Sequence, residues 1–162
     1  MLEENFIHPI DYPVWVSNIG PVGKASGGIC VCSNFSDLNL ACPKDDFPLP
    51  NINIIVDLTI GHEILSLMDG FSSYNQIKIV EEDQHKMAFT TPWGTFCYQV
   101  MPFVLKNVST TCQCTMTTIF HDLLHVIMED YVYDILGKSK TNESHIDVIT
   151  TILKGWRNIT CP

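Results

Sequence analysis

Apolar residues recur at three- and four-residue steps across residues 109–128, and this spacing predicts one long amphipathic helix. The apolar stripe of this helix would consist of Met116, Ile119, Phe120, Leu123, Leu124 and Ile127. A second helix is expected over residues 146–156, after a polar segment at 141–144 that suits a helix start. A short helix is expected over residues 53–59, ending near Gly61.

Shorter apolar runs and alternating segments predict strands. The expected strands cover residues 14–16, 29–32, 64–69, 76–80, 86–91, 95–100 and 130–136. Turns are expected at Gly27-Gly28, at Pro92-Trp93-Gly94 and at Gly137. Six prolines within residues 1–50 predict mainly irregular and extended chain in that part. Helices and antiparallel strands mix without a regular β-α-β order, which indicates the α+β class.

Composition narrows the class of protein. A chain of 162 residues with 46% hydrophobic and 17% charged residues fits one folded domain rather than a disordered chain. The net charge of −9, with only nine Lys and Arg, argues against a strong grip on a nucleic acid backbone. The acidic start at residues 1–5 and the lack of a long apolar run predict an intracellular protein, cytoplasmic or nuclear, without membrane contact. Seven cysteines, an odd number, are then expected as reduced thiols.

One metal site can be considered from residue spacing alone. His121 and His125 are four residues apart, so on a helix they could share one metal ion. Cys114 would lie about 10 Å from His121 along the helix axis, too far to join them in a tetrahedral zinc site. The simpler interpretation is that the two histidines lie on the surface of an amphipathic helix.

Three segments in a fixed order carry a resemblance to a known family. They are Met68-Asp69-Gly70-Phe71-Ser72, Thr91-Pro92-Trp93-Gly94-Thr95-Phe96 and Tyr131-Val132-Tyr133-Asp134. In order and spacing they resemble the reverse transcriptase domain of a gypsy-like LTR retrotransposon polyprotein, and the resemblance runs from about Asn5 to His145. It implies a palm, with an antiparallel sheet packed on helices, over residues 59–162 and a partial fingers subdomain over residues 1–58. The thumb, RNase H and integrase segments of such polyproteins are expected to be absent.

The resemblance also implies a site for template-directed nucleotidyl transfer by two Mg²⁺ ions. Asp69 and Asp134 would be the catalytic metal ligands, and Gly70 would offer its carbonyl to a metal. The nucleotide site would include Gly70, Phe71, Tyr74 and Phe103, with the ring of Tyr74 under the incoming sugar. Lys24 and Lys106 would contact the template or phosphates. The implied partners are a dNTP, an RNA template and a DNA primer, held weakly because the chain has few cations.

Departures from the family pattern fall at positions of function. Tyr133 stands where the family has the first Asp of its acidic pair, and a phenol is neutral at pH 7 and a poor Mg²⁺ ligand. Val104 replaces a glycine, while Cys30, Asn34 and Ser36 replace charged residues. The expectation is therefore a degenerate reverse transcriptase fragment with impaired catalysis. The alternative is a palm scaffold kept by a host as a protein- or RNA-binding module; the residues do not indicate an oligomeric state.

Overall fold

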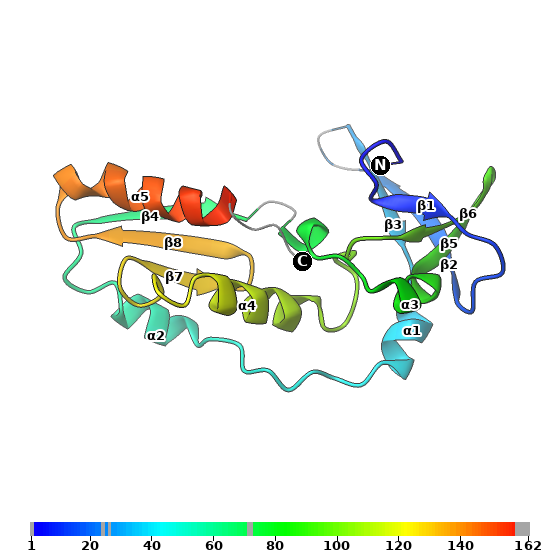
Figure 1. Ribbon diagram of the computed structural model, residues 1–162, viewed down its shortest axis with the longest axis horizontal. Helices are drawn as coiled ribbons and strands as arrows, with labels where there is room; N and C mark the ends of the chain where they lie inside the picture. The colour runs from blue at the N-terminus through cyan, green and yellow to red at the C-terminus, as the bar shows by residue number, and fades with distance from the viewer. Residues whose placement is uncertain (1, 24, 26, 71–72, 158–162) are drawn as a thin grey trace. The chain divides into compact units, whose positions relative to one another are not determined.

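The computed structural model describes residues 2–23, 25, 27–70 and 73–157, and its contacts divide the chain into two compact units (Figure 1). Unit 1 combines Met1–Lys44 with Tyr74–Val108, and unit 2 combines Asp45–Ser73 with Ser109–Pro162. Each unit contains both strands and helices, as expected for the α+β class. The assignment of residues 1–58 to fingers and 59–162 to a palm stays a prediction, and the two compact units have different bounds.

Unit 1 is built on a five-stranded sheet with the order β1-β6-β5-β2-β3. The strands are β1 (Ile7–Pro9), β2 (Val16–Gly23), β3 (Ile29–Ser33), β5 (Ala88–Thr91) and β6 (Gly94–Tyr98). Neighbouring strands are antiparallel except for β2 and β5, which run parallel. The short helices are α1 (Ser36–Ala41), α3 (Glu81–Gln84) and the 3₁₀ turn η2 (His85–Met87). A further 3₁₀ turn, η1 (Ser73–Gln76), lies where the chain returns to unit 1 at Tyr74. Buried Phe35, Phe89 and Tyr98 form the centre of its core.

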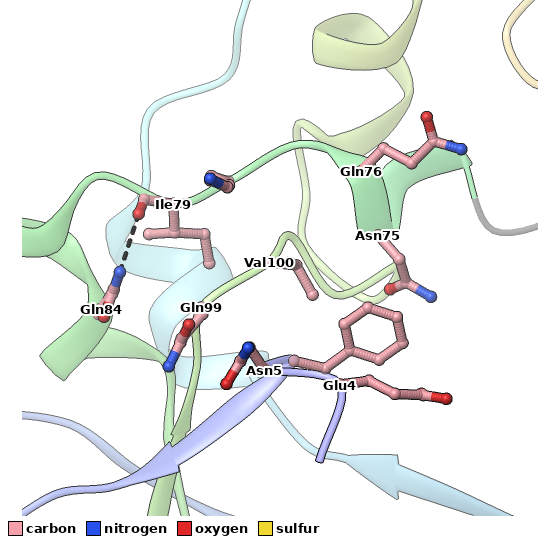
Figure 2. Close-up of a pocket in the computed structure, with 10 residues that line it drawn as sticks. Glu4, Asn5, Asn75, Gln76, Ile79, Gln84, Gln99 and Val100 are labelled. Atoms are coloured by element: carbon pink, nitrogen blue, oxygen red, sulfur yellow. Dashed lines mark hydrogen bonds between the residues drawn. The ribbon is translucent and has the colours of Figure 1, made fainter. Parts of the chain in front are cut away.

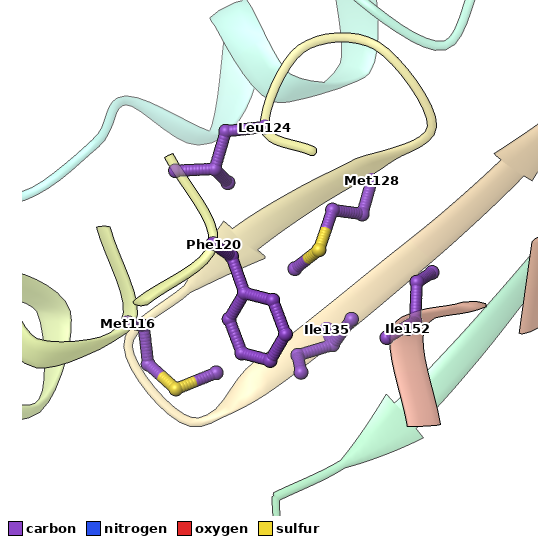
Figure 3. Close-up of a cluster of buried hydrophobic side chains, with 6 residues drawn as sticks. All are labelled: Met116, Phe120, Leu124, Met128, Ile135 and Ile152. Atoms are coloured by element: carbon purple, nitrogen blue, oxygen red, sulfur yellow. The ribbon is translucent and has the colours of Figure 1, made fainter. Parts of the chain in front are cut away.

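Unit 2 is built on an antiparallel three-stranded sheet with the order β4-β8-β7. The strands are β4 (Ile64–Asp69), β7 (Met128–Tyr131) and β8 (Asp134–Ser139), and the helices are α2 (Ile52–Asp57), α4 (Val108–Ile119) and α5 (Asn142–Arg157). Its core consists of Met116, Phe120, Leu124, Met128, Ile135 and Ile152 (Figure 3). These residues come from α4 and the turns after it, from β7 and β8, and from α5. The core therefore joins α4, β7, β8 and α5, and Met68 of β4 packs against it.

Two glycines allow α5 to lie very close to its neighbours. A Cβ atom at Gly137 in β8 would lie 2.8 Å from Cδ1 of Ile149, and one at Gly155 in α5 would lie 2.8 Å from Cε1 of Phe120. Real Cβ atoms essentially never approach other atoms this closely, so larger residues would push α5 away from the sheet. Gly137 was expected as a turn, but it lies inside β8. A residue without a side chain is needed there because α5 packs closely against the strand.

Several expected elements are present. The run 64–69 is strand β4, and the segment 29–32 lies within β3. The short helix expected over 53–59 is α2, and Gly61 after it has a positive φ of 83°. Gly27 lies between β2 and β3 with a φ of 85°, which suits the expected turn. The hairpin around Pro92-Trp93-Gly94 is formed by β5 and β6.

Other expectations are wrong. The helix expected over 109–128 ends at Ile119, and residues 120–127 form turns. The apolar residues keep the same spacing through these turns. The carbonyl of Phe120 still accepts backbone hydrogen bonds from Leu123 and Leu124 there. The strand expected over 76–80 is reduced to an isolated bridge between Lys78 and Val100.

Three further boundaries differ from the expectation. The segment 130–136 is not one strand, because the chain reverses after Tyr131 to form the β7–β8 hairpin. The strand expected at 14–16 begins only at Val16 and continues to Gly23. Helix α1 was not expected at all, since residues 1–50 looked irregular; its six residues carry too short a pattern to reveal a helix.

The structure describes the state of five cysteines and the length and character of the helices. The five cysteines whose side chains are described, Cys32, Cys42, Cys97, Cys112 and Cys114, are free thiols. Burial raises the pKa of the Cys97 thiol, so this group stays protonated at neutral pH. Within the described residues, no helix has both the length and the apolar character needed to cross a bilayer.

A buried glutamine holds the β7–β8 hairpin to α4. The Gln113 amide nitrogen donates to Oδ2 of Asp130, and its amide oxygen accepts from the backbone N–H of Val132 at 2.8 Å. Gln113 is 3% exposed and Asp130 8% exposed, so both polar groups are satisfied inside the unit. Burial nevertheless raises the pKa of Asp130, since the hydrogen bond from Gln113 only partly offsets the loss of water around the carboxylate.

A second buried polar network joins α2, the turn before β7, and β8. Lys138 and Glu129 form an ion pair of 2.6 Å, and both side chains are 2% exposed. Lys138 also donates to the carbonyls of Leu58 and His125, at 2.9 Å and 3.3 Å. Nδ1 of His125 lies 2.7 Å from the other carboxylate oxygen of Glu129. All three donors of the ammonium group therefore have acceptors, which is what a buried charge requires.

This network predicts a marked asymmetry between single and double substitutions. Lys138→Met leaves the Glu129 carboxylate buried without its cation, and the free energy of unfolding should fall by about 3–5 kcal/mol. Combining it with Glu129→Met removes both charges, and most of that loss should be recovered. The check is urea unfolding of both variants and the wild type at pH 7. A double variant as unstable as Lys138→Met would show that the ion pair itself stabilises unit 2.

The raised pKa of Asp130 gives a prediction with a defined sign. A carboxyl group whose pKa is higher in the folded than in the unfolded state destabilises the fold as pH rises above the unfolded pKa, and the whole cost is present above the folded pKa. Asp130→Asn should therefore raise the melting temperature at pH 7, and the gain should shrink as pH falls towards the ordinary value of 3.8.

Melting curves from pH 7 to pH 4 measure this difference. Asp147→Asn is a matched control, because Asp147 is exposed on α5. It should change stability little at either pH. A gain for Asp130→Asn that does not depend on pH would contradict the assigned cause.

Candidate functional site

Two exposed carboxylates face each other across the sheet of unit 2. Asp69 is the last residue of β4 and Asp134 the first of β8, and they are direct partners in the antiparallel register. The next pair is hydrogen-bonded, because the N–H of Gly70 donates to the carbonyl of Tyr133 at 2.8 Å. Asp69 and Asp134 therefore form a non-hydrogen-bonded pair, in which the Cα atoms are about 4.5 Å apart and both side chains lie on one face. This pairing brings together residues 65 positions apart in the sequence, which a metal site shared by Asp69 and Asp134 would require.

Gly70 is the residue that lets the hairpin approach β4 so closely. A Cβ atom there would lie 2.5 Å from the carbonyl oxygen of Tyr133 and 3.0 Å from Cη2 of Trp156. No side chain can be placed at this position without moving either the hairpin or α5. The glycine is therefore needed to position the two carboxylates, independently of any role of its carbonyl in metal binding.

The turn of the hairpin is tight and strained. Val132 has a φ of 59°, a region that β-branched residues avoid, and the N–H of Tyr133 donates to the carbonyl of Tyr131 at 2.7 Å. Gln113 holds the turn in place through the N–H of Val132. The half-buried Tyr133 places its hydroxyl 3.2 Å from Oγ of Ser109 in α4. The phenol therefore has a polar partner in the helix, which makes it compatible with this position.

The carboxylates can offer oxygen ligands to a hard cation, but they are few. Like charges placed directly opposite each other across two strands repel, and a divalent cation between them would offset that repulsion. Within the described residues, no group of three or more His, Cys, Asp or Glu side chains could hold a metal ion. Among the described residues, the carboxylates that this strand pairing places opposite each other are those of Asp69 and Asp134, and Tyr133 lies next to Asp134.

The histidine pair does not form the helical metal site that its spacing suggested. Both residues lie beyond the end of α4, and His125 has a φ of 63°. Nε2 of His121 lies 2.9 Å from the Asp122 carboxylate, and His125 is engaged with Glu129. The i, i+4 geometry of a shared ligand site requires a continuous helix, which is missing here.

The remaining candidate residues with described positions belong to unit 1. Tyr74 and Phe103 lie together, with ring centroids 6.2 Å apart, and Phe103 is 55% exposed. Nζ of Lys106 donates to the carbonyl of Cys42 at 2.9 Å, so its charge is already partly engaged. Phe71 and Lys24 lie outside the described residues.

Val104, which the resemblance places where the family has a glycine, also belongs to unit 1. It packs on the core of the unit, and its carbonyl accepts from the Asn39 amide at 2.9 Å. The described non-glycine residues with positive φ are Asn5, Tyr12, His125 and Val132. The backbone at Val104 therefore adopts a conformation that a valine tolerates without strain.

Gln113 is the residue of the site that the sequence analysis missed. Its signal was present, because residue 113 lies three positions before Met116 and seven before Phe120, on the apolar stripe of α4. A polar residue on a buried stripe must find a partner, and here the partners are Asp130 in β7 and Val132 in the turn that follows. The identity of those partners depends on tertiary contacts that spacing alone does not reveal.

Comparisons with known proteins match this chain to one family. The family model described as reverse transcriptase (RNA-dependent DNA polymerase) matches residues 26–161. The Tf2-3 and Tf2-7 transposon polyproteins of Schizosaccharomyces pombe (strain 972 / ATCC 24843) are each 28% identical over 137 residues, covering 85% of this chain. The chain spans only 10% of the length of these relatives.

Solved structures show the same fold. A foamy viral protease-reverse transcriptase in complex with an RNA/DNA hybrid superposes with a TM-score of 0.84 at 16% identity, over 96% of this chain and 21% of that one. The native prototype foamy virus protease-reverse transcriptase gives a TM-score of 0.79 at 15% identity, with coverage of 96% and 21%. At such identities the likeness concerns the fold, whereas the family model covers most of the sequence. The chain belongs to the reverse transcriptase (RNA-dependent DNA polymerase) family.

Proposed function

We propose that the chain is part of a degenerate reverse transcriptase of a gypsy-like LTR retrotransposon, with impaired nucleotidyl transfer. The single observation that carries the proposal is the pairing of Asp69 with Asp134 beside the β7–β8 hairpin, where the family resemblance implies an acid at the position of Tyr133. The similarity to the Tf2 polyproteins supports the retrotransposon origin. A place inside the cell, in the cytoplasm or nucleus, follows from that origin.

The two carboxylates fit one Mg²⁺ ion, the cation that the family implies. Mg²⁺ takes oxygen ligands and commonly binds through one or two carboxylates, with water and substrate phosphates completing its shell. Asp69 and Asp134 would hold the ion, and the backbone next to Asp69 would supply the carbonyl of Gly70. When bound, the metal supplies charge neutralisation for the transferred phosphate and lowers the pKa of an attacking hydroxyl.

Impairment follows from the chemistry of Tyr133. A phenol has a pKa near 10, so at neutral pH it brings no negative charge to share between two metal ions. Its hydroxyl is also directed to Ser109 of α4. Losing a metal clamp removes several kcal/mol of transition-state stabilisation, which corresponds to a rate lower by roughly 10³-fold.

The remaining assignments concern substrates. Tyr74 and Phe103 form an aromatic pair suited to the sugar and base of an incoming dNTP, and Phe71 is proposed for the same site. Lys106 and Lys24 are proposed as contacts to the RNA template and DNA primer. Foamy viral relatives have been solved with double-stranded DNA and with an RNA/DNA hybrid. The net charge of −9 and the engaged Lys106 favour weak binding by this chain.

Metal binding tests the carboxylate pair directly. Mn²⁺, a paramagnetic substitute for Mg²⁺, should bind weakly and broaden the NMR signals of Asp69, Gly70 and Asp134 first. Asp69→Asn should abolish that local effect. Tyr133→Asp should raise Mn²⁺ affinity by about tenfold or more, because it adds a third carboxylate to the site.

Tyr133→Asn is the matched control, since it removes the same ring but adds no charge. It should leave Mn²⁺ affinity near that of the wild type. Broadening that begins elsewhere in unit 2, or equal affinities for Tyr133→Asp and Tyr133→Asn, would contradict the proposed metal site.

Primer extension tests the impairment. The chain should show no incorporation above background on an RNA template with Mg²⁺ or Mn²⁺, and Tyr133→Asp alone should restore little. The reason is that Val104, Cys30 and Ser36 still replace family residues of function. Clear incorporation by the wild type, abolished in Asp69→Asn, would overturn the impairment while keeping the assigned carboxylates. A strong rescue by Tyr133→Asp alone would show that the other departures matter little.

A further inference from the structure

Helix α5 carries apolar side chains on the face turned away from its own sheet. Its inner face packs on β8, since a Cβ atom at Gly137 would lie 2.8 Å from Cδ1 of Ile149 and 3.2 Å from Cδ1 of Ile152. Ile146 and Leu153 lie on the outer face instead, where they are 76% and 50% exposed. Burial of these two side chains against a partner would remove apolar surface from water, which favours association.

The two exposed residues have the spacing of a helix–helix seam. Ile146 and Leu153 are seven residues apart, so they point in nearly the same direction, about 10 Å apart along the helix. A repeat of seven residues is the one that keeps a stripe of side chains facing a partner helix. Thr150, exposed and short, lies between them along the helix and would let a partner approach closely.

Two exposed charges of opposite sign run beside this seam. Asp147 directly follows Ile146, and Lys154 directly follows Leu153, so the charges repeat with the same seven-residue step. Within the part of the chain that the structure describes, neither charge belongs to an ion pair. The acid lies towards the start of α5 and the cation towards its end, so α5 is electrostatically complementary to its own reverse.

We propose that two copies of this chain associate through α5, with the two helices antiparallel and the two-fold axis near Thr150. Ile146 then packs on Leu153 of the second copy, and Asp147 pairs with Lys154 of the second copy. The two-fold axis repeats both contacts, which makes the surface self-complementary. A parallel arrangement would instead bring Asp147 beside its own counterpart, and like charges repel.

Two other surfaces fit a second copy less well. Helix α2 exposes Ile52, Ile54 and Val56, but it has only six residues and Asp57 is its one charged residue. The cavity of about 490 Å³ in unit 1 is lined by Asn and Gln at half of its residues (Figure 2). Exposed carboxamides are well hydrated, so they provide little driving force for association. The inference concerns α5 alone and does not rest on the metal chemistry proposed for Asp69 and Asp134.

The dimer should be weak. One pair of helices of this length buries less than the roughly 1,200–2,000 Å² of a stable interface. Each chain also carries a net charge of −9, so two copies repel each other at long range. We expect a dissociation constant on the order of 100 µM, so the chain is mainly monomeric at low micromolar concentration.

Charge exchange tests the antiparallel arrangement by sedimentation equilibrium from about 10 to about 500 µM chain. Asp147→Lys and Lys154→Asp should each weaken the dimer by roughly fivefold or more, because each turns both ion pairs into repulsive ones. The first change makes the chain less negative and the second more negative, so a shared loss reflects the local pairs rather than net charge. The variant with both changes should regain most of the wild-type affinity, because both pairs form again with their signs exchanged.

The apolar part of the seam has a matched control. Ile146→Ser should weaken the dimer by roughly tenfold or more, whereas Leu67→Ser should leave its affinity unchanged. Leu67 is 80% exposed and belongs to β4, outside the proposed seam. Circular dichroism and melting curves at low micromolar concentration show whether each variant keeps its fold. If Ile146→Ser unfolds, Leu153→Ala takes its place with the same expectation.

A crosslink locates the two-fold axis directly. Under mild oxidation, Thr150→Cys should give a dimer joined through position 150, identified by mass spectrometry of the linked peptides. Thr151→Cys is the control, because the next position on a helix points about 100° away. Its thiol should form several-fold less of the corresponding crosslink, since a disulfide requires Cβ atoms about 3.5–4.5 Å apart.

Dimerisation that is lost in both single charge variants and regained in the double variant supports the proposal. A mixture of the two single variants provides a second test, because each copy then offers the charges that the other lacks, and it should associate more strongly than either alone. A wild-type chain that stays monomeric up to about 500 µM overturns the proposal. So does a double variant as weak as the single ones, or a loss in Leu67→Ser equal to that in Ile146→Ser.

Discussion

The register between β4 and β8 is the constraint on which unit 2 depends. Side chains alternate between the two faces of a strand, so a slip of one residue would move Met68 and Ile135 out of the core and turn the carboxylates of Asp69 and Asp134 to the opposite face. Apolar patterning alone specifies such a register weakly, because β4 carries leucines on the outer face as well, with Leu67 80% exposed. Additional contacts must therefore select the correct alignment.

His145 of α5 supplies one of those contacts. Its Nε2 lies 2.8 Å from Oγ of Ser66 in β4, and its Nδ1 lies 2.8 Å from Oγ of Ser139 in β8. One imidazole thus ties both strands to the helix that covers them. Gly137 adds a steric condition, because only a glycine there allows Ile149 to reach the sheet. The helix, the two strands and their register are selected together.

Three charged residues of this small sheet, Glu129, Asp130 and Lys138, are buried. Asp130 lies on the core face and is satisfied by Gln113, while Glu129 and Lys138 satisfy each other beneath the end of α2. Buried pairs of this kind add little net stability, because desolvation offsets most of their attraction. Their effect is geometric: each hydrogen bond fails if α2, β7 or β8 shifts, and all three elements position the hairpin that carries Asp134.

The sequence was sufficient for the elements that depend on local pattern. The run from Ile64 to Asp69 is bounded by polar residues and is apolar enough to indicate its strand, and α5 follows from its start signal and its periodicity. The end of α4 could not be found in this way, since the turns after Ile119 continue the same spacing of apolar residues. The Glu129–Lys138 pair was also hidden, because two charged residues in separate strands look like solvent-exposed positions until the chain is folded.

The position of Tyr133 separates what the fold needs from what the chemistry needs. The hairpin is held by Gln113, by the Gly70–Tyr133 backbone hydrogen bond and by the core contacts of Ile135, none of which involves the side chain of residue 133. Its phenol instead finds Ser109, so a large neutral ring is accepted without a buried unpaired group. A carboxylate at this point would serve metal binding and contribute nothing to the register of the strands. The pairing of Asp69 with Asp134 therefore does not depend on the side chain at position 133, and an intact β4–β8 pairing reports on the fold and not on the chemistry of the site.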